Sequence, residues 1–99
     1  MSSSKDFKNY VLDQLNDLNY ITCKPMMGEF LLYYNGVLFG GIYDNRLLIK
    51  ITKTNSLHKL PKEIPYTNAK PMFKIKDIDD KAFLYSIIKE TYLDLKRPN

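Results

Sequence analysis

The sequence predicts an α+β fold with two layers: a helix, an antiparallel sheet of four to five strands, a short helix, a further strand and a C-terminal helix. Near both ends of the chain, apolar residues recur at spacings of three and four, which is the period of an amphipathic helix. Between them, aromatic and β-branched runs are separated by dipeptides that favour tight hairpin turns. A chain of 99 residues can bury one core, so we expect a single domain over residues 1–99.

The first helix is predicted to begin near Ser3, because Asp6 follows three residues later and an acid is favourable at the positive end of a helix. We expect this helix to run to about Asn19. Its apolar stripe comprises Phe7, Tyr10, Val11, Leu15 and Leu18.

Residues 20–24 are predicted to form a short strand that Pro25 closes, because proline cannot donate to a strand ladder. Residues 29–34 and 37–43 flank Asn35-Gly36, which is the strongest short-range signal for a hairpin. A second tight turn, Asp44-Asn45, leads into residues 46–51. These runs therefore predict three strands of a meander.

The C-terminal part is predicted to be less regular until its last helix. Residues 55–60 could form one helical turn, and residues 72–76 alternate as a strand does. Acids precede the closing helix, whose apolar stripe follows at helical spacing; these residues are Asp77, Asp79, Asp80, Leu84, Ile87, Ile88, Thr91 and Leu95.

Two-residue turns would fix which residues share a sheet face, because opposite residues of an antiparallel pair point the same way. One face is then apolar throughout, and we expect it to be the core: Leu31, Tyr33, Leu38, Gly40, Ile42, Leu47, Ile49 and Ile51. The other face is far less polar than a solvated face should be. It carries Gly41 and the side chains of Phe30, Leu32, Tyr34, Val37, Phe39, Tyr43, Arg46, Leu48 and Lys50.

This second face is the predicted interaction face. Monomers seldom leave large contiguous apolar areas in water, so we expect it to bind a protein partner or a second copy of the chain as a homodimer. Two alternatives stay open: a terminal segment folds over the face, or one turn is longer and the register slips.

No catalytic, cofactor or metal site is predicted. Cys23 and His58 are the only thiol and imidazole, and nothing in the sequence places them together as a nucleophilic pair. The acids of residues 77–80 lack the glycine and distal glutamate of a calcium loop, so helix capping explains them better. Gly40-Gly41 lacks a phosphate-loop lysine, and a bulge or a close backbone approach is its simpler explanation. We therefore expect a protein that is not an enzyme.

Nucleic-acid binding is the alternative function. The chain has a formal net charge of +4, with 8 Tyr and 5 Phe, and bases stack on aromatic rings flanked by basic residues. An RNA-recognition signature is absent and the lysines are scattered from Lys5 to Lys96, so we expect such contact to be weak or indirect.

The sequence also predicts a cytoplasmic protein without membrane contact. No apolar run approaches the roughly 20 residues that cross a bilayer. The polar N-terminus lacks the pattern of a secretory signal, and the single cysteine fits a reducing compartment.

Nearly the whole chain resembles the N-terminal domain of the TfoX/Sxy competence-regulator family, and in particular its small stand-alone bacterial members. The resemblance lies in a Met-rich turn, a hairpin and an Arg-Leu-x-x-Lys strand. The matching segments are residues 25–36 and 39–42, Asp44, Arg46, Leu47, Lys50, residues 65–66, 69–72 and 79–81, Phe83 and Leu84.

The resemblance implies a two-layer α/β domain with the element order given above. Full-length regulators of the family act in bacterial competence gene expression alongside a DNA-bound activator, and they carry a second, C-terminal domain. Because this chain ends at Asn99 without one, the resemblance favours a protein-interaction module in transcription regulation over direct DNA regulation. Met27 stands where the family commonly has Phe, which is compatible with packing. No catalytic residue is carried over.

Overall fold

Three successive hairpin turns of one type organise the sheet in the computed structural model, which describes residues 3–96. Met27-Gly28, Asn35-Gly36 and Asp44-Asn45 each have positive φ at both residues. Such a pair forms a type I′ turn, whose twist matches that of the flanking strands. The turns join β1 (Ile21–Met26), β2 (Glu29–Tyr34), β3 (Val37–Ile42) and β4 (Leu47–Ile49).

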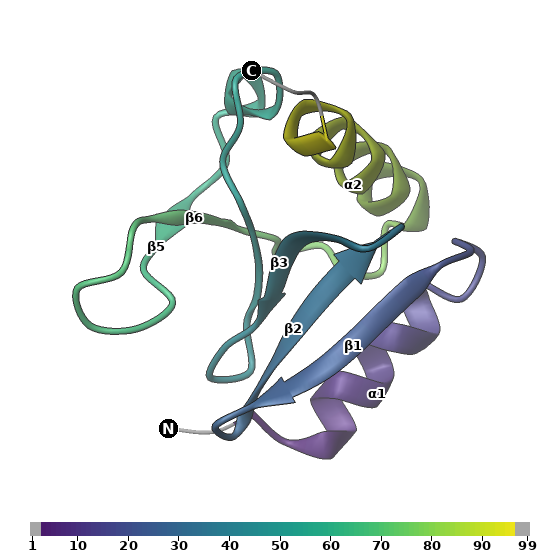
Figure 1. Ribbon diagram of the computed structural model, residues 1–99, viewed down its shortest axis with the longest axis vertical. Helices are drawn as coiled ribbons and strands as arrows, with labels where there is room; N and C mark the ends of the chain where they lie inside the picture. The colour runs from purple at the N-terminus through teal and green to yellow at the C-terminus, as the bar shows by residue number, and fades with distance from the viewer. Residues whose placement is uncertain (1–2, 97–99) are drawn as a thin grey trace.

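The sheet has six strands in the order β1-β2-β3-β4-β6-β5, and every pair is antiparallel. In Figure 1, β1 and the loop between β5 and β6 lie at opposite ends of the sheet. The predicted α+β architecture is confirmed. The sequence does not predict β5 (Lys62–Glu63), which pairs with β6 (Met72–Lys74). A strand of two residues is too short to show the alternation that identifies strands in a sequence.

Helix capping sets both helix starts. In α1 (Lys5–Gln14) the Phe7 N–H donates to Ser4 Oγ at 3.1 Å, so the cap is Ser4 rather than Ser3. In α2 (Lys81–Lys96) the Phe83 N–H donates to Asp80 Oδ1 at 3.1 Å, as the acids before this helix predict. No helix within residues 3–96 is long and apolar enough to cross a membrane.

Several predicted boundaries are wrong. The strands expected over residues 46–51 and 72–76 are shorter, at Leu47–Ile49 and Met72–Lys74, and two further differences concern α1 and β1. Helix α1 ends at Gln14 instead of about Asn19, although Leu15 and Leu18 still point into the core. Strand β1 continues through Pro25, which lies opposite Phe30. The proline is tolerated because β1 is an edge strand, where an unmade ladder bond faces no further strand. The short helix predicted over residues 55–60 is the 3-10 helix η1 (Asn55–His58).

Both helices pack on one face of the sheet and form the main core with it (Figure 1). The buried apolar side chains come from α1 and the turn after it, from β2 to β4, from the segment after β6, and from α2. They are Val11, Leu15, Leu18, Leu32, Phe39, Ile42, Leu47, Ile49, Ile75, Ile78, Leu84, Ile87 and Ile88.

A β-bulge in β3 changes the predicted register. Tyr33 lies opposite Leu38, but Leu32 lies opposite Gly40, so Phe39 is an extra residue in its strand. Beside the bulge, β3 lies so close to β4 that a Cβ on Gly40 would come 2.2 Å from the Leu48 carbonyl oxygen. The strands approach too closely there for a side chain, and β3 bends. The expectation of a bulge or close approach at Gly40-Gly41 is thus confirmed.

The bulge overturns part of the predicted face assignment. The expected core residues Gly40, Ile42, Leu47 and Ile49 do lie on the helix-covered face, whereas Leu31, Tyr33 and Leu38 lie on the opposite one, and Ile51 lines a cavity there. A one-residue change of register exchanges the two faces of a strand, so the side chains of β2 lie on the opposite faces of the sheet from those predicted.

Candidate binding groove

The sheet face away from the helices, called here the open face, is the candidate functional surface. Antiparallel pairing places one set of side chains on it across the strands. This set comprises Thr22, Lys24, Met26, Glu29, Leu31, Tyr33, Leu38, Tyr43, Arg46, Leu48, Glu63, Met72 and Lys74.

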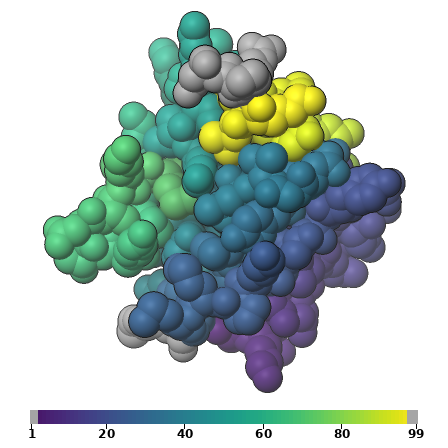
Figure 2. Space-filling view, viewed as in Figure 1, coloured from purple at the N-terminus to yellow at the C-terminus, as the bar shows by residue number. Residues whose placement is uncertain are grey.

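One internal segment covers part of the open face. Residues 64–71, called here the groove loop, connect β5 to β6 and stand beside the strands of the meander in Figure 2. Tyr43, Leu48 and Met72 form a second small buried cluster at this end of the sheet, and Pro65 of the loop is buried as well. The covering segment is therefore internal to the chain, where the sequence left a terminal segment as the alternative.

Arg46 attaches the groove loop to the sheet. Its Nη1 donates to Glu63 Oε1 at 2.8 Å and to the Ile64 carbonyl oxygen at 3.2 Å, and its Nη2 donates to the Pro65 carbonyl oxygen at 3.3 Å. Its Nε donates to the carbonyl oxygen of Tyr43 at 3.0 Å. The planar guanidinium can make all these bonds at once, which a lysine ammonium cannot do in the same geometry.

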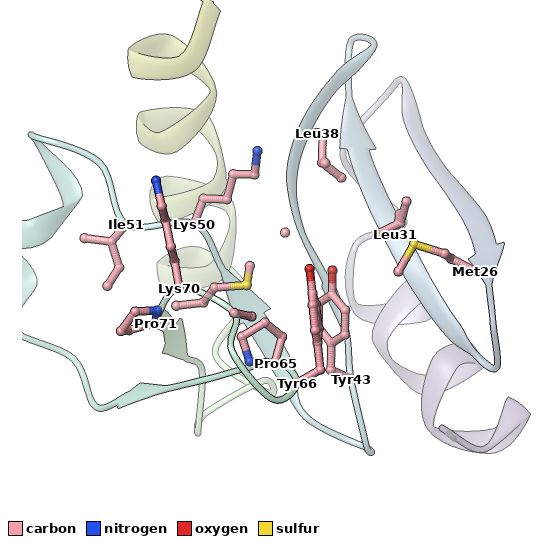
Figure 3. Close-up of a pocket in the computed structure, with 13 residues that line it drawn as sticks. Met26, Leu31, Leu38, Tyr43, Lys50, Ile51, Pro65, Tyr66, Lys70 and Pro71 are labelled. Carbon is pink, nitrogen blue, oxygen red and sulfur yellow. The ribbon is translucent and has the colours of Figure 1, made fainter. Parts of the chain in front are cut away.

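A groove of about 530 Å³ lies between the groove loop and the meander strands. This volume falls within the range of roughly 300–1,000 Å³ that ligand sites usually have. Figure 3 shows lysine side chains on one side, tyrosine hydroxyls at the centre, and leucine and methionine side chains on the other side. The lining residues are Met26, Leu31, Leu38, Gly40, Tyr43, Lys50, Ile51, Pro65, Tyr66, Ala69, Lys70, Pro71 and Met72.

Tyr43 and Tyr66 form the centre of the groove. Their ring centroids are 6.2 Å apart at an interplanar angle of 48°, and in Figure 3 their hydroxyls point the same way. Burial raises the pKa of Tyr43, and nearby Tyr66 and Glu29 add to the effect. The Tyr43 hydroxyl therefore keeps its proton at neutral pH and can donate a hydrogen bond to an acceptor in the groove.

The charges around the groove are unbalanced. Within residues 3–96, no ion pair involves Lys24, Lys50 or Lys70, and the Lys24 ammonium instead lies 5.0 Å from the centre of the Tyr33 ring. The nearby acids are engaged. Glu63 binds Arg46 and Lys74, and the hydrogen bond from Arg46 lowers the pKa of Glu63. Glu29 accepts hydrogen bonds from the Ser3 hydroxyl and the Asp44 N–H.

The structure divides the predicted interaction face between the two sides of the sheet. Leu32 and Phe39 are completely buried under the helices, with Phe30 and Tyr34 packed against the same core and Val37 opposite Tyr34. The remaining residues lie at the groove end of the open face; they are Tyr43, Arg46, Leu48 and Lys50. The bulge is the reason, because the prediction assumed an unbroken ladder from the turn to the far end of β3.

Cys23 and His58 are not brought together. Cys23 lies opposite Leu32 on the helix-covered face, where burial raises the pKa of its thiol despite the nearby charge of Lys8. His58 Nε2 lies 2.8 Å from Glu90 Oε1, on η1 and α2. Within residues 3–96, no group of three His, Cys, Asp or Glu side chains is placed to hold a metal ion.

Sequence reasoning missed the wall that the groove loop supplies. Pro65, Tyr66, Lys70 and Pro71 line the groove, but this segment has no hydrophobic period that would place it on the sheet. The sequence offers one signal for the other wall, the pair Gly40-Gly41. A bulge at these glycines shifts the β2–β3 register by one residue, and the β2 side chain that lines the groove then lies on the open face.

No protein-family model matches the chain, and no curated protein matches it.

Proposed function

We propose that the chain is a non-enzymatic protein-interaction module of the cytoplasm that binds a protein partner through its open face. The observation that carries the proposal is the groove, which keeps apolar side chains accessible beside lysines that form no ion pair within residues 3–96. A concave, largely apolar surface with a few convergent polar groups is typical of a binding site. The groove residues include no nucleophile activated by a base, and an acid–base pair is equally missing.

A different protein suits this surface better than a second copy of the chain. A symmetric dimer would bring the same patch of both copies together, and with it two sets of lysines that have no acidic partner in the described part of the chain. Like charges placed opposite each other weaken an interface. We therefore expect a monomer at micromolar concentration, which light scattering behind a sizing column can measure.

The proposal extends to the TfoX/Sxy resemblance. We include membership of that family, and a role linked to competence-type transcription regulation, as parts of the proposed function. The supporting residues are those of the Met-rich turn and the first hairpin, residues 25–36, together with the Arg46-Leu47 strand start.

The test replaces accessible leucines by serine in two matched places. Leu31→Ser with Leu38→Ser removes apolar area from the groove, and Leu57→Ser with Leu93→Ser removes exposed leucines from η1 and α2. Each tagged form is expressed in the native host, cross-linked, purified, and its bound proteins are quantified. The groove variant is expected to lose partners that the control retains, while both keep the wild-type circular dichroism and cooperative unfolding. Identical partner sets for the two variants would reject the open face.

Nucleic-acid binding is the second candidate, favoured by one observation. Tyr66 is 58% exposed at the groove, whose lining also includes Lys70, so an unpaired base could stack on it. Tyr43 offers less, since its ring is buried against the sheet. Fluorescence polarisation with a single-stranded oligonucleotide at two salt concentrations tests the candidate, because phosphate contacts weaken steeply with salt. Absence of binding at low salt removes it.

A further inference from the structure

We propose that the groove binds an acidic, extended segment of the partner protein, with a bulky apolar side chain seated between the two walls and flanking carboxylates at the lysines. This inference rests on the proposed function and specifies the chemistry of the occupant.

The shape of the groove calls for an inserted side chain. One wall is formed by Leu31 and Leu38 of the meander and the other by Pro65 and Pro71 of the groove loop. Met72 is also part of the lining. An apolar side chain placed there would cover carbon atoms that now face water, which is a favourable transfer. The volume of about 530 Å³ leaves room for a segment of chain rather than for a whole folded surface.

The polar groups of the groove select negative charge. Lys50 and Lys70 lie on the same side in Figure 3, and the Tyr43 and Tyr66 hydroxyls point into the space next to them. The two ammonium groups and the two hydroxyls can each donate a hydrogen bond to a carboxylate. No acid of the described chain occupies these lysines, because Glu29 and Glu63 are engaged elsewhere. An acidic partner therefore gains new charge-assisted bonds without breaking existing ones.

Charge complementarity also decides between the possible occupants. A second copy of this chain would present lysines to lysines, whereas an acidic segment would present the opposite sign. A nucleic acid would also bring negative charge, but the polar edges of its bases would lose hydrogen bonds to water against the apolar walls, whereas an aliphatic side chain would not. Oligonucleotides therefore serve as the competing occupant in the test.

The test begins with the complete chain immobilised and a random peptide library displayed on phage. Enriched peptides are expected to combine a leucine, isoleucine or phenylalanine with two or more flanking aspartates or glutamates. The most enriched peptide is then synthesised with a fluorescent label, and its affinity is measured by fluorescence polarisation. An oligonucleotide of the same net charge is measured beside it and is expected to bind more weakly.

Two charge-matched double variants locate the binding. Lys50→Gln with Lys70→Gln removes the lysines of the groove, whereas Lys53→Gln with Lys89→Gln removes exposed lysines near η1 and α2, outside the groove lining. We expect the groove variant to bind the peptide about tenfold more weakly or worse, and the control to bind within about twofold of wild type. Both variants keep the same net charge, so a general charge effect would move them equally.

Each remaining outcome overturns the inference in a recognisable way. Enriched peptides without acids, or no enriched peptides, reject the acidic segment; so does equal weakening in both lysine variants, or tighter binding of the oligonucleotide. If the peptides lack acids but Leu31→Ser with Leu38→Ser abolishes their binding, the inference fails and the proposed interaction face survives. If no groove variant changes binding of any peptide or captured protein, both fail.

Discussion

The Arg46 guanidinium lies 2.8 Å from the Glu63 carboxylate, and the same side chain donates to carbonyl oxygens at the start of the groove loop. This one residue therefore holds the loop against the end of the sheet where the groove opens. The arrangement makes the shape of the groove depend on a side chain that lies outside its lining.

Arg46→Lys is expected to loosen the groove loop while leaving the core intact. Lysine keeps the charge but cannot reach Glu63 and two carbonyl oxygens with one planar group. Hydrogen–deuterium exchange should rise about tenfold at the Ala69 N–H, which donates to the Tyr66 carbonyl oxygen, and stay unchanged in α2. Lys74→Arg is the control, since it preserves the remaining contact with Glu63. An unchanged loop in Arg46→Lys contradicts the anchoring role.

Acid should release the same loop. The hydrogen bond from Arg46, and to a lesser degree the charge of Lys74, lowers the pKa of Glu63 in the folded protein. A lowered folded-state pKa means that the stabilisation is present above the unfolded value of about 4.3 and is lost as pH falls through the folded value. Loop exchange, corrected for intrinsic rates, should therefore increase below about pH 4 in wild type. The Glu63→Gln variant should already be loose at neutral pH and show no such acid step.

Alkaline conditions should destabilise the protein through Tyr43. Burial raises its pKa, so the unfolded state loses its proton first as pH rises. The stabilisation is complete below the unfolded value of about 10 and declines as pH rises toward the folded value. Urea unfolding measured from about pH 8 to about pH 11, a range that spans the usual titration of tyrosine, should show a shallower decline for Tyr43→Phe than for wild type. Tyr20→Phe, at an exposed ring, should follow the wild-type curve.

Gly40→Ala and Gly36→Ala separate two reasons for a glycine. At Gly40 a Cβ would lie 2.2 Å from a backbone oxygen of β4, so strands must move apart, and we expect a loss of about 3 kcal/mol or more. At Gly36 nothing lies within 4 Å of the added Cβ, but φ is +78°, so only local strain of about 1 kcal/mol is expected. Denaturant unfolding measures both. Equal losses would mean that the close approach at the bulge is not a constraint.

Asn55 should contribute strongly to stability through three hydrogen bonds. Its Oδ1 accepts the Thr52 N–H at 2.7 Å, and its Nδ2 donates to the Lys50 carbonyl oxygen at 2.8 Å and to Thr91 Oγ1 at 2.7 Å. Because the side chain is fully buried, Asn55→Ala removes the partner of the Thr52 N–H and of the Lys50 carbonyl oxygen and one of the two bonds of Thr91 Oγ1, which should cost about 3 kcal/mol. The exposed Asn9→Ala on α1 should change unfolding by less than about 0.5 kcal/mol. Similar values for the two variants would contradict the assigned network.

Local signals predicted the elements well because each depends on near neighbours. The turn at Asn35-Gly36 and the acids before α2 are read from two or three consecutive residues, and both are found where expected. The face assignment failed at Phe39, because a single extra residue reverses the sides of β2, Val37 and Leu38 relative to the strands beyond the bulge. Ile42, Leu47 and Ile49 were still placed correctly, since the second turn fixes their pairing independently of the bulge.

The groove could not be predicted in the same way because its two walls are far apart in sequence. Leu31 and Tyr66 line the same groove only because β6 pairs with β4, and no periodicity within residues 61–71 indicates that pairing. The lysines illustrate the same limit. Lys50 was expected on the functional face, whereas Lys70 lies in a segment that sequence reasoning left irregular.

The bulge at Phe39 also restricts how this protein can change over generations. Removing one residue between Val37 and Gly40 would restore an unbroken ladder, and β2 would then present Leu31 and Tyr33 to the helices and Leu32 to water. A substitution in this hairpin alters one side chain, whereas a single-codon deletion would exchange the two faces of β2 at once. Descendants should therefore conserve the length of this hairpin as strictly as its glycine at position 40.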